Sequence, residues 1–511
     1  MPAKDNGPPT TSSKWFRTFL AVSGAIGIEF IAGTIESQSA VLLPQLEVST
    51  ELPITKDQAS WIASFGTLAC PFTSFLCGPL MDLWGRRLVF KIYYTVSAIG
   101  YLIIGFATQV WHLYVGRLCL AFSLGFTVAN VIYLPEITTT RQRSVVLSTI
   151  NPLFSFGLLF GYAIGGYMAW DTASFIQACI CGLGLGFMFF LPESPAWLVK
   201  KKRPEDARRV YEYLGRKTTK IAGDIAQLAT TGDGGSVKSS IPLKLFKHPT
   251  VWKPFLILII FHLLQTMTGV YNIMFYTVEF FADLGTVFDP ILVAISFGAA
   301  RFIVCCTVGT YFTTRCPRRI ATAVSGFGSG VSYLAAVAYE CYYKSVAAKD
   351  RQLQWIPIAA VLLSCVFSTA GVQALPWIMT GEVYPLSVRG VMGGATFFVG
   401  NIFLFLTIKF HFALMDALGM TGVLTFFAVA CIVSGAYGLM ILPETQGKTM
   451  LEIERGFIRR KKGTIEPIEF KYGRGDGELR ISTIYQRTTV SFTEESDEHQ
   501  TSDDVVESKF P

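Results

Sequence analysis

Charged residues stand at fixed spacings beside apolar segments, and their types are those that form ion pairs. The run Gly78-Pro79-Leu80-Met81-Asp82-Leu83-Trp84-Gly85-Arg86-Arg87 places one acid and two arginines at the end of such a segment. The spacing Glu136-x6-Arg143 follows a later segment and recurs as Glu382-x6-Arg389. Exposed ion pairs are worth about 0–1 kcal/mol each, so a network of them can form and break at modest cost. Because the spacing occurs twice, it predicts two related halves whose charges latch and unlatch.

The elements that carry these charges are apolar runs of about 20 residues, each long enough to cross a bilayer. The 511-residue chain is 51% hydrophobic and 15% charged, whereas soluble proteins carry about 25% charge. The apolar segments lie at roughly 18–41, 59–79, 88–107, 113–134, 145–168, 173–191, 254–281, 290–312, 320–341, 355–379, 391–414 and 420–442. The sequence therefore predicts an all-α membrane protein with twelve transmembrane helices in two pseudo-symmetric six-helix halves.

This pattern divides the chain into five parts. We expect a cytoplasmic N-terminal tail at 1–14, an N-terminal half at 15–191, a cytoplasmic linker at 192–250, a C-terminal half at 251–442 and a cytoplasmic tail at 443–511. A short linker helix is predicted between Pro204 and Gly215, because acids fill its first turn. The tail is predicted to be disordered after about 463, since its end is acidic and rich in Ser and Thr.

The distribution of charge indicates orientation and excludes several functions. Lysines and arginines gather in one set of loops and in the linker at 200–220, with the loop 342–354 as an exception. This bias predicts that both termini lie in the cytoplasm. The location expected for this multi-pass protein is the cell (plasma) membrane. The net charge of +7 does not indicate nucleic acid, because no patch interleaves basic and aromatic residues. The 11 cysteines lack metal-ligand spacing and there is no Gly-x4-Gly-Lys-Ser/Thr loop, so no metal, cofactor or ATP drive is expected.

Two further motifs complete the pattern and carry a resemblance. Pro192-Glu193-Ser194-Pro195-x-Trp197-Leu198 closes the sixth segment, and Pro443-Glu444-Thr445-Gln446-Gly447-Lys448-Thr449 closes the twelfth. From about residue 15 to 455 the chain resembles the sugar porter family of the major facilitator superfamily. The linker and Phe275-Tyr276-Thr277 look most like its arthropod facilitated trehalose transporter group.

The resemblance implies a cytoplasmic gate in which Glu193 and Glu444 meet arginines of the opposite motifs. The second Asp-Arg-x-Gly-Arg-Arg motif is altered to Thr314-Arg315-Cys316-Pro317-Arg318-Arg319. The predicted ion-pair network consists of Asp82, Arg86, Arg87, Glu136, Arg143, Glu193, Arg315, Arg318, Glu382, Arg389 and Glu444.

The resemblance also indicates a substrate path, with departures. The family's seventh-segment pattern Gln-Gln-x-Ser-Gly-Ile-Asn reads Gln265-Thr266-Met267-Thr268-Gly269-Val270-Tyr271 here, with Asn272 displaced by one, and Gln373 and Ala374 replace a Gly and a Pro of the tenth segment. Amides offer donors and acceptors together, and an aromatic face covers the C–H side of a sugar ring. The substrate-binding candidates are Gln265, Thr268, Tyr271, Asn272, Asn151, Trp377 and Asn401. The alternative for each of them is a hydrogen bond between neighbouring helices.

Four ionisable residues lie inside apolar segments: Glu29 and Glu36 in the first, Arg117 in the fourth and Arg301 in the eighth. Charge in mid-bilayer is costly and is usually paired or functional. Glu29 and Glu36 are seven residues apart and share a helix face. In proton-coupled members of the family, a first-segment acid pairs with the fourth-segment arginine, and Glu36 falls next to that position. A proton-coupling site and a static ion pair both remain open.

The sequence thus predicts a transporter, not an enzyme, that moves a sugar (hexose, trehalose or related polyol) by alternating access as a facilitative uniporter. One alternative is a proton-coupled sugar symporter that uses Glu29 or Glu36 with Arg117. A second is a non-transporting sugar sensor or receptor on the same scaffold, suggested by the altered seventh-segment motif and the acidic tail. The expected partners are a small-molecule sugar or polyol and the lipid bilayer, without nucleic acid.

Overall fold

The computed structural model describes residues 11–138, 146–189, 191–216, 221–223, 225–226, 248–285, 287–344, 346, 350–385, 388–448 and 450–457. Two compact units divide the chain, Met1–Ile458 and Arg459–Pro511, and the described residues all belong to the first. Within these ranges the regular elements are helices, without a strand. Arg143, the side chain of Arg389 and the tail predicted to be disordered lie outside the described part.

The first half of the bundle carries six spans. Its helices are α1 (Thr11–Glu47), α2 (Lys56–Leu68), α3 (Cys70–Trp84), α4 (Arg86–Gly105), α5 (Val110–Leu124), the 3-10 turn η1 (Gly125–Thr127), α6 (Val128–Ile137), α8 (Ile150–Tyr167) and α9 (Trp170–Phe187). The second and fourth spans are each interrupted: α2 and α3 form one span, and α5, η1 and α6 form another.

The linker and the second half follow. The linker contains α10 (Pro195–Lys200) and α11 (Pro204–Tyr213), and the second of these lies in the segment for which the sequence predicts a helix. The second half contains α14 (Pro249–Met267), α15 (Val270–Phe275), α16 (Thr277–Asp283), α17 (Pro290–Val304), the π-helical turn η2 (Cys305–Gly309), α18 (Thr310–Arg315), α19 (Arg318–Tyr342), α20 (Trp355–Ala370), α21 (Leu375–Glu382), α22 (Arg389–Lys409) and α23 (His411–Met440), and α24 (Met450–Phe457) comes after it.

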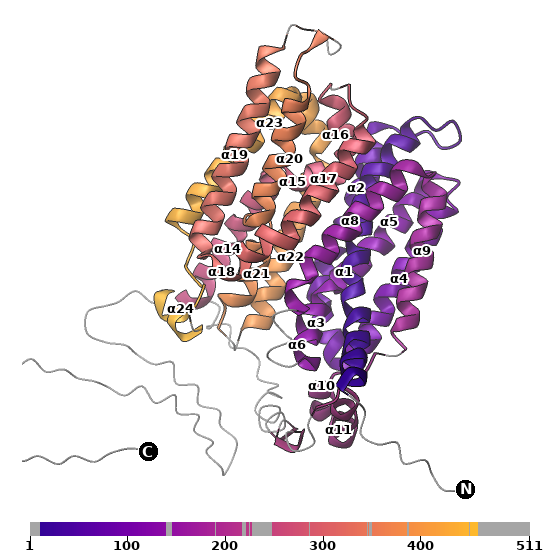
Figure 1. The fold of residues 1–511 in the computed structure, drawn as a ribbon, viewed down its shortest axis with the longest axis vertical. Coiled ribbons are helices and arrows are strands. Elements are labelled where there is room, and N and C mark those ends of the chain that lie inside the picture. Colours follow the sequence, from indigo (N-terminus) through magenta and orange to yellow (C-terminus); the bar gives the residue numbers. More distant parts are fainter. Residues whose placement is uncertain are drawn as a thin grey trace, which may run out of the picture. The chain divides into compact units, whose positions relative to one another are not determined.

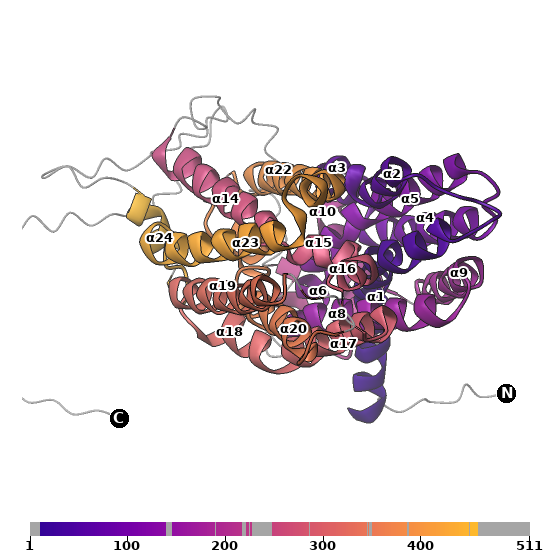
Figure 2. The ribbon, with the colours of Figure 1, turned by 90° about the horizontal axis from the view of Figure 1, so that it is seen from above.

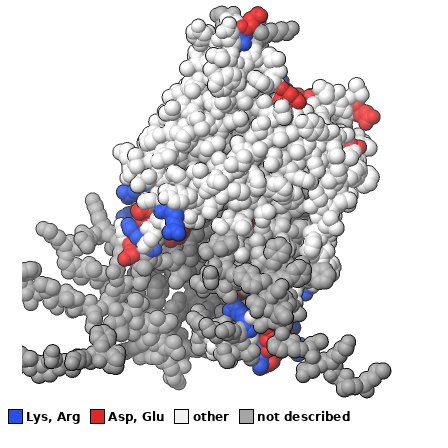
Figure 3. Space-filling model, viewed as in Figure 1, with Lys and Arg blue, Asp and Glu red and all other residues white. Residues whose placement is uncertain are grey.

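Eleven helical segments among the described residues are long and apolar enough to cross a membrane. The remaining predicted span, the sixth, is occupied by α9, which is more polar because it includes Asp171, Thr172 and Gln177. Figure 3 shows an uncharged surface between acidic and basic residues at the two ends of the bundle. This distribution fits a body whose middle faces lipid.

The two halves repeat one packing scheme. α4 packs on α5 and α9 as α19 packs on α20 and α23, and α1 packs on α8 as α14 packs on α22. The halves lie side by side in Figures 1 and 2 and meet where α2 and α3 contact α22 and where α8 contacts α17. We call the end that carries α10, α11 and α24 the linker end. At the opposite end α1 also packs on α15 and α16, which brings the halves together there.

Glycine allows α1 and α8 to touch through their backbones. A Cβ atom on Gly157 would lie 2.0 Å from the carbonyl oxygen of Phe30, and one on Gly33 would lie 2.0 Å from that of Phe154. Small residues at helix interfaces permit this approach in membrane proteins, where close packing replaces the hydrophobic effect as the cohesive force.

This contact gives the first prediction. Gly157→Ala should lower the free energy of unfolding by about 1–3 kcal/mol, because the added methyl group forces the two backbones apart. The measurement is the thermal midpoint of the purified protein in detergent. Gly182→Ala in α9 is the matched control, since a Cβ there meets nothing within 4 Å. Equal midpoints for the two variants would show that the backbone contact does not limit stability.

Candidate functional site

The first charge cluster lies at the linker end, where α3 passes into α4. Arg86 is 7% exposed and donates to Glu136 through Nε at 3.1 Å and Nη2 at 3.0 Å. Its Nη1 lies 3.4 Å from Asp82. Glu193 accepts from the backbone N–H groups of Arg86 at 2.8 Å and Arg87 at 3.3 Å. The cluster therefore joins the α3–α4 turn to α6 and to the segment after α9.

Gly85 makes this docking feasible. Its backbone φ of +89° is a conformation that residues with a Cβ rarely adopt. A Cβ at this position would also lie 2.5 Å from Glu193 Oε2. Glu193 thereby reaches the free N–H groups at the start of α4, where a negative charge is favoured.

The second cluster repeats the first in the other half. Arg318, 4% exposed, donates to Glu382 through Nη2 at 2.7 Å and Nε at 3.3 Å. Glu444 accepts from the backbone N–H groups of Arg318 at 2.9 Å and Arg319 at 3.3 Å. The Thr445 hydroxyl donates to Glu382 at 2.6 Å. The altered motif of the second half thus forms the same glutamate cap and arginine–glutamate bonds as the first. Pro317 is the N-cap residue of α19.

The position of these clusters differs from the expectation of a latch between halves. In the described residues, Glu193 and Glu444 are each bonded to arginines of their own half, because each caps the helix that follows the turn beside it. The Arg87 side chain donates to carbonyl oxygens of Met188 and Phe189, also in its own half. Arg315 is exposed and takes part in no ion pair of the described residues. The clusters brace each half internally.

The linker attaches to the first cluster through contacts that sequence reasoning missed. Lys200 Nζ lies 3.0 Å from Asp82 Oδ2, and Trp197 Nε1 donates to the Asp82 carbonyl at 3.1 Å. Both residues belong to α10, whose N-cap is Ser194. The motif that closes the sixth segment thus also fixes the linker helix to α3.

A cluster of amide and aromatic side chains lies at the interrupted seventh and tenth spans. Gly269 in a left-handed conformation separates α14 from α15, and residues 371–374 separate α20 from α21. Gln265 Nε2 donates to the Gln373 carbonyl at 2.5 Å and to the Tyr271 hydroxyl at 3.4 Å. Trp377 Nε1 donates to the same hydroxyl at 3.1 Å. Breaks in spans are typical of places where a transporter exposes polar groups.

His262 completes this group, and sequence reasoning did not select it. It is 1% exposed, and its Nδ1 lies 3.1 Å from Gln265 Oε1. Its ring is edge-on to the Trp377 ring, with 4.5 Å between the ring centroids. A signal was present, because His262 stands three residues before Gln265 and therefore on the same face of α14. We call His262, Gln265, Tyr271, Gln373 and Trp377 the amide–aromatic cluster.

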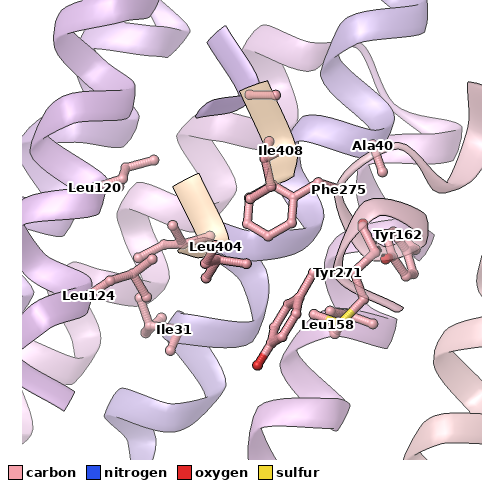
Figure 4. Packing of buried hydrophobic residues seen from close by; sticks show 14 of the residues in the cluster. Ile31, Ala40, Leu120, Leu124, Leu158, Tyr162, Tyr271, Phe275, Leu404 and Ile408 are labelled. Atoms are coloured by element: carbon pink, nitrogen blue, oxygen red, sulfur yellow. Dashed lines mark hydrogen bonds between the residues drawn. The ribbon is translucent and has the colours of Figure 1, made fainter. Parts of the chain in front are cut away.

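Figure 4 shows Tyr271 between side chains of both halves, with its hydroxyl pointing away from Phe275. Leu158 comes from α8 of the first half, whereas Leu404 comes from α22 of the second. The cluster therefore borders the interface of the two halves.

The other substrate-binding candidates lie apart from these hydrogen bonds or join them only indirectly. Thr268 donates to the Gln265 carbonyl at 2.6 Å. Asn272 is 1% exposed, and its Oδ1 has no hydrogen-bond partner among the described residues. Asn401 donates to the Phe397 carbonyl of its own helix at 2.9 Å. Asn151 is exposed in the first turn of α8.

The pairing of Glu29 or Glu36 with Arg117, which the sequence leaves open, is not formed among the described residues. Arg117 is fully buried and donates to the Ile35 carbonyl at 3.0 Å, Gln38 Oε1 at 3.2 Å, Ser39 Oγ at 2.5 Å and the Ile62 carbonyl at 3.2 Å. Neutral acceptors of α1 and α2 thus satisfy the guanidinium. Glu29 instead accepts from Asn130 at 2.9 Å.

Arg301 is the second buried cation of the interior, and it joins the halves. Its Nη1 donates to Gln373 Oε1 at 2.5 Å and its Nε to Ser155 Oγ at 3.3 Å. The guanidinium also lies 5.4 Å from the ring centroid of Phe154. Arg301 therefore connects α17 to α8 and to the amide–aromatic cluster.

The end opposite the linker is held by Lys409, another residue that sequence reasoning missed. Its Nζ lies 3.1 Å from Asp57 and 4.0 Å from the ring centroid of Trp61, and its carbonyl accepts from Ser60 at 2.7 Å. These contacts pin the end of α22 to the start of α2, and we call them the Lys409 clasp. Nearby, burial raises the pKa of Asp283 while Lys56 opposes this shift.

Comparison with known proteins matches nearly all of the bundle to one family. The profile of the family described as "Sugar (and other) transporter" matches residues 27–457. The facilitated trehalose transporter Tret1 of Aedes aegypti is 26% identical over 90% of this chain, which spans 58% of that protein, and Tret1 of Culex quinquefasciatus is 26% identical over 89% of this chain and 90% of its own length. The resemblance stated from the sequence is confirmed.

Solved structures confirm the twelve-helix major facilitator fold. The inward open conformation of the xylose transporter XylE from E. coli aligns with a TM-score of 0.70 at 14% identity, covering 86% of this chain and 99% of that chain. The proton:xylose symporter XylE bound to 6-bromo-6-deoxy-D-glucose aligns with a TM-score of 0.66 at 16% identity, covering 88% and 100%.

The charge clusters give the second prediction. Arg318→Ala should lower the free energy of unfolding by about 1.5–3 kcal/mol, because it removes hydrogen bonds to a charged partner and leaves Glu382 uncompensated. Arg315→Ala is the matched control, an exposed arginine three residues away whose loss should cost little. Thermal unfolding of the purified variants measures the difference. If Arg315→Ala destabilises the protein as much, the buried cluster has no special role.

Proposed function

The chain belongs to the family of sugar and other transporters within the major facilitator superfamily, and from this membership we propose that it carries a hexose, trehalose or a related polyol across the plasma membrane. The transport cycle is alternating access, in which the two halves rock about a central site. The observation that carries the proposal is the family match over residues 27–457, together with the amide–aromatic cluster that borders the interface of the halves.

The composition of that cluster favours a neutral polyol. Gln265 and Gln373 present amides, and Tyr271 and Trp377 present aromatic faces with polar edges. A polyol offers many hydroxyl donors and acceptors and apolar C–H faces but no charge, so amides and aromatic rings match it. The named relatives are facilitated trehalose transporters, which supports the same substrate class.

We propose facilitative uniport as the mode. The neutral acceptors that satisfy Arg117 support it, because release of that arginine by protonation of an acid requires an ion pair that the described residues do not form. A proton-coupled symporter is the second candidate, and Glu36 supports it, since its carboxylate has a buried oxygen without a partner among the described residues.

We further propose that the linker end faces the cytoplasm and that this conformation is closed to the outside. The bias of basic loops supports the orientation. The packing of α1 on α15 and α16 and the Lys409 clasp support closure at the opposite end. Opening to the outside then requires these contacts to separate.

Uptake of radiolabelled trehalose and hexoses by oocytes that express the chain tests the function. We expect saturable uptake that equilibrates without accumulation and is unchanged between mildly acidic and neutral external pH. Accumulation above the external concentration, abolished by a protonophore, would establish the symporter instead. Normal surface expression without uptake of any polyol would reject the proposed transport.

Tyr271→Phe gives the third prediction. The KM for the transported polyol should rise several-fold, because the variant removes a hydroxyl that organises Gln265 and Trp377, and one such hydrogen bond is worth about 0.5–1.5 kcal/mol. Tyr384→Phe is the control, since its hydroxyl is bonded to Thr396 at 2.6 Å, outside the cluster. A KM unchanged in Tyr271→Phe would remove the cluster from the substrate site.

Lys409→Met gives the fourth prediction. Loss of its ion pair and its contact with Trp61 should shift the protein toward opening at that end, by about fivefold or more in the ratio of the two states. Spin labels at the exposed positions Glu51 and Asp416, in a background without the 11 native cysteines, report the distance distribution across this end. Lys91→Met is the control, because Lys91 lies over the Phe189 ring at the linker end. Identical distributions in both variants would argue against the clasp.

A further inference from the structure

Glu36 is a partly buried acid whose neighbours along α1 have hydrogen-bond partners. Ile35 and Gln38 accept from Arg117, as does Ser39. Glu36 Oε2, in contrast, is shielded from solvent and has no hydrogen-bond partner in the described part of the chain. A buried polar atom without a partner is costly, so its presence requires an explanation.

The surroundings of Glu36 place its carboxylate between the two halves. It lies within electrostatic reach of Arg301 and, more weakly, of Arg117. Tyr271 and Tyr162 also feel its charge. These groups belong to α17, α5, α15 and α8, so the carboxylate faces the region where helices of both halves converge.

A static ion pair does not account for this arrangement. The nearest cation in electrostatic terms, Arg301, directs its guanidinium to Gln373 and Ser155, both neutral. No ion pair within 4.0 Å joins Glu36 to an arginine among the described residues. Acid and guanidinium therefore lie near one another while the acid keeps an acceptor free.

We propose that Glu36 binds the substrate directly, as the acceptor for hydroxyl hydrogens of the transported polyol, opposite the amide–aromatic cluster. This inference rests on the proposed function. A carboxylate accepts without donating, and its two oxygens match the hydroxyl groups on adjacent carbons of a sugar. Arg301 lies within electrostatic reach of this carboxylate, and the Oε2 atom of Glu36 stays available to accept hydrogen bonds from a neutral ligand.

The amide–aromatic cluster and Glu36 would select different features of the ligand. The amide–aromatic cluster can both donate and accept and therefore tolerates hydroxyls of either orientation. Glu36 requires donors, so a deoxy or O-methyl group at the position it contacts leaves its oxygen unpaired and is strongly disfavoured. Glu36 thus selects for free hydroxyl groups on one edge of the ligand.

The test is exchange transport by the full chain in proteoliposomes, with the polyol that the unmodified protein carries and its series of monodeoxy analogues. In the unmodified protein one or two analogues should show a KM at least about tenfold higher than the parent, since hydrogen bonds to charged groups are the stronger ones. In Glu36→Gln the parent should show a similarly raised KM, and the penalty for those analogues should largely disappear.

Glu29→Gln is the matched control. Glu29 lies on the same face of α1, but its carboxylate already accepts from Asn130. Every deoxy penalty should stay as in the unmodified protein. Glu36→Asp serves if Glu36→Gln does not fold: it keeps the charge, withdraws the acceptor by one methylene, and should reduce the same penalties.

Two outcomes overturn the inference while the proposed function stands. The first is polyol exchange by the folded Glu36 variants with every deoxy penalty unchanged. The second applies if the unmodified chain proves to be the symporter: an unchanged exchange KM with loss of proton-driven accumulation would make Glu36 a proton carrier, while polyol transport itself stands. Absence of polyol transport by the unmodified chain removes the proposed function itself and the inference with it.

Discussion

A charge inside a bundle that faces lipid must find its partners within the protein, and most of this structure follows from how that requirement is met. Arg117 meets it with carbonyl, amide and hydroxyl oxygens from α1 and α2. Arg301 meets it across the interface of the halves through Ser155 and Gln373. Each arginine therefore fixes the relative position of several helices, and the spacing of the bundle is set by donors that cannot be left unpaired.

The same requirement at the linker end produces two rigid halves. Glu193 and Glu444 each cap a helix, and Glu136 and Glu382 each hold the arginine that begins that helix. Because every one of these contacts stays within its half, the charges oppose deformation of a half more than separation of the two. A cycle in which two bodies rock against each other needs such internal stiffness.

The sequence predicted the spans and the acids and arginines of these clusters, because hydropathy and repeated charge spacing survive without three-dimensional information. It left open whether Glu29 or Glu36 pairs with Arg117, because the neutral acceptors that this arginine uses, two backbone carbonyls and the side chains of Gln38 and Ser39, carry no distinctive charge pattern in the sequence. His262 and Lys409 were missed for a related reason: a lone polar residue in an apolar run becomes informative only when its neighbours from other helices are known. Gln265 and Gln373, the amides of the seventh and tenth spans, lie together in the structure. Asn401, in contrast, donates to a carbonyl of its own helix.

The start of α19 shows what persists when two repeats diverge. The first half reaches its arrangement through a glycine with positive φ, and the second reaches it through a proline at φ −54°. Compared letter by letter, Thr314-Arg315-Cys316-Pro317-Arg318-Arg319 looks like an eroded copy. Compared contact by contact, it keeps the glutamate cap and the arginine–glutamate bonds of the first half. The relationship between these two repeats is therefore clearer from their interatomic contacts than from the identity of their residues.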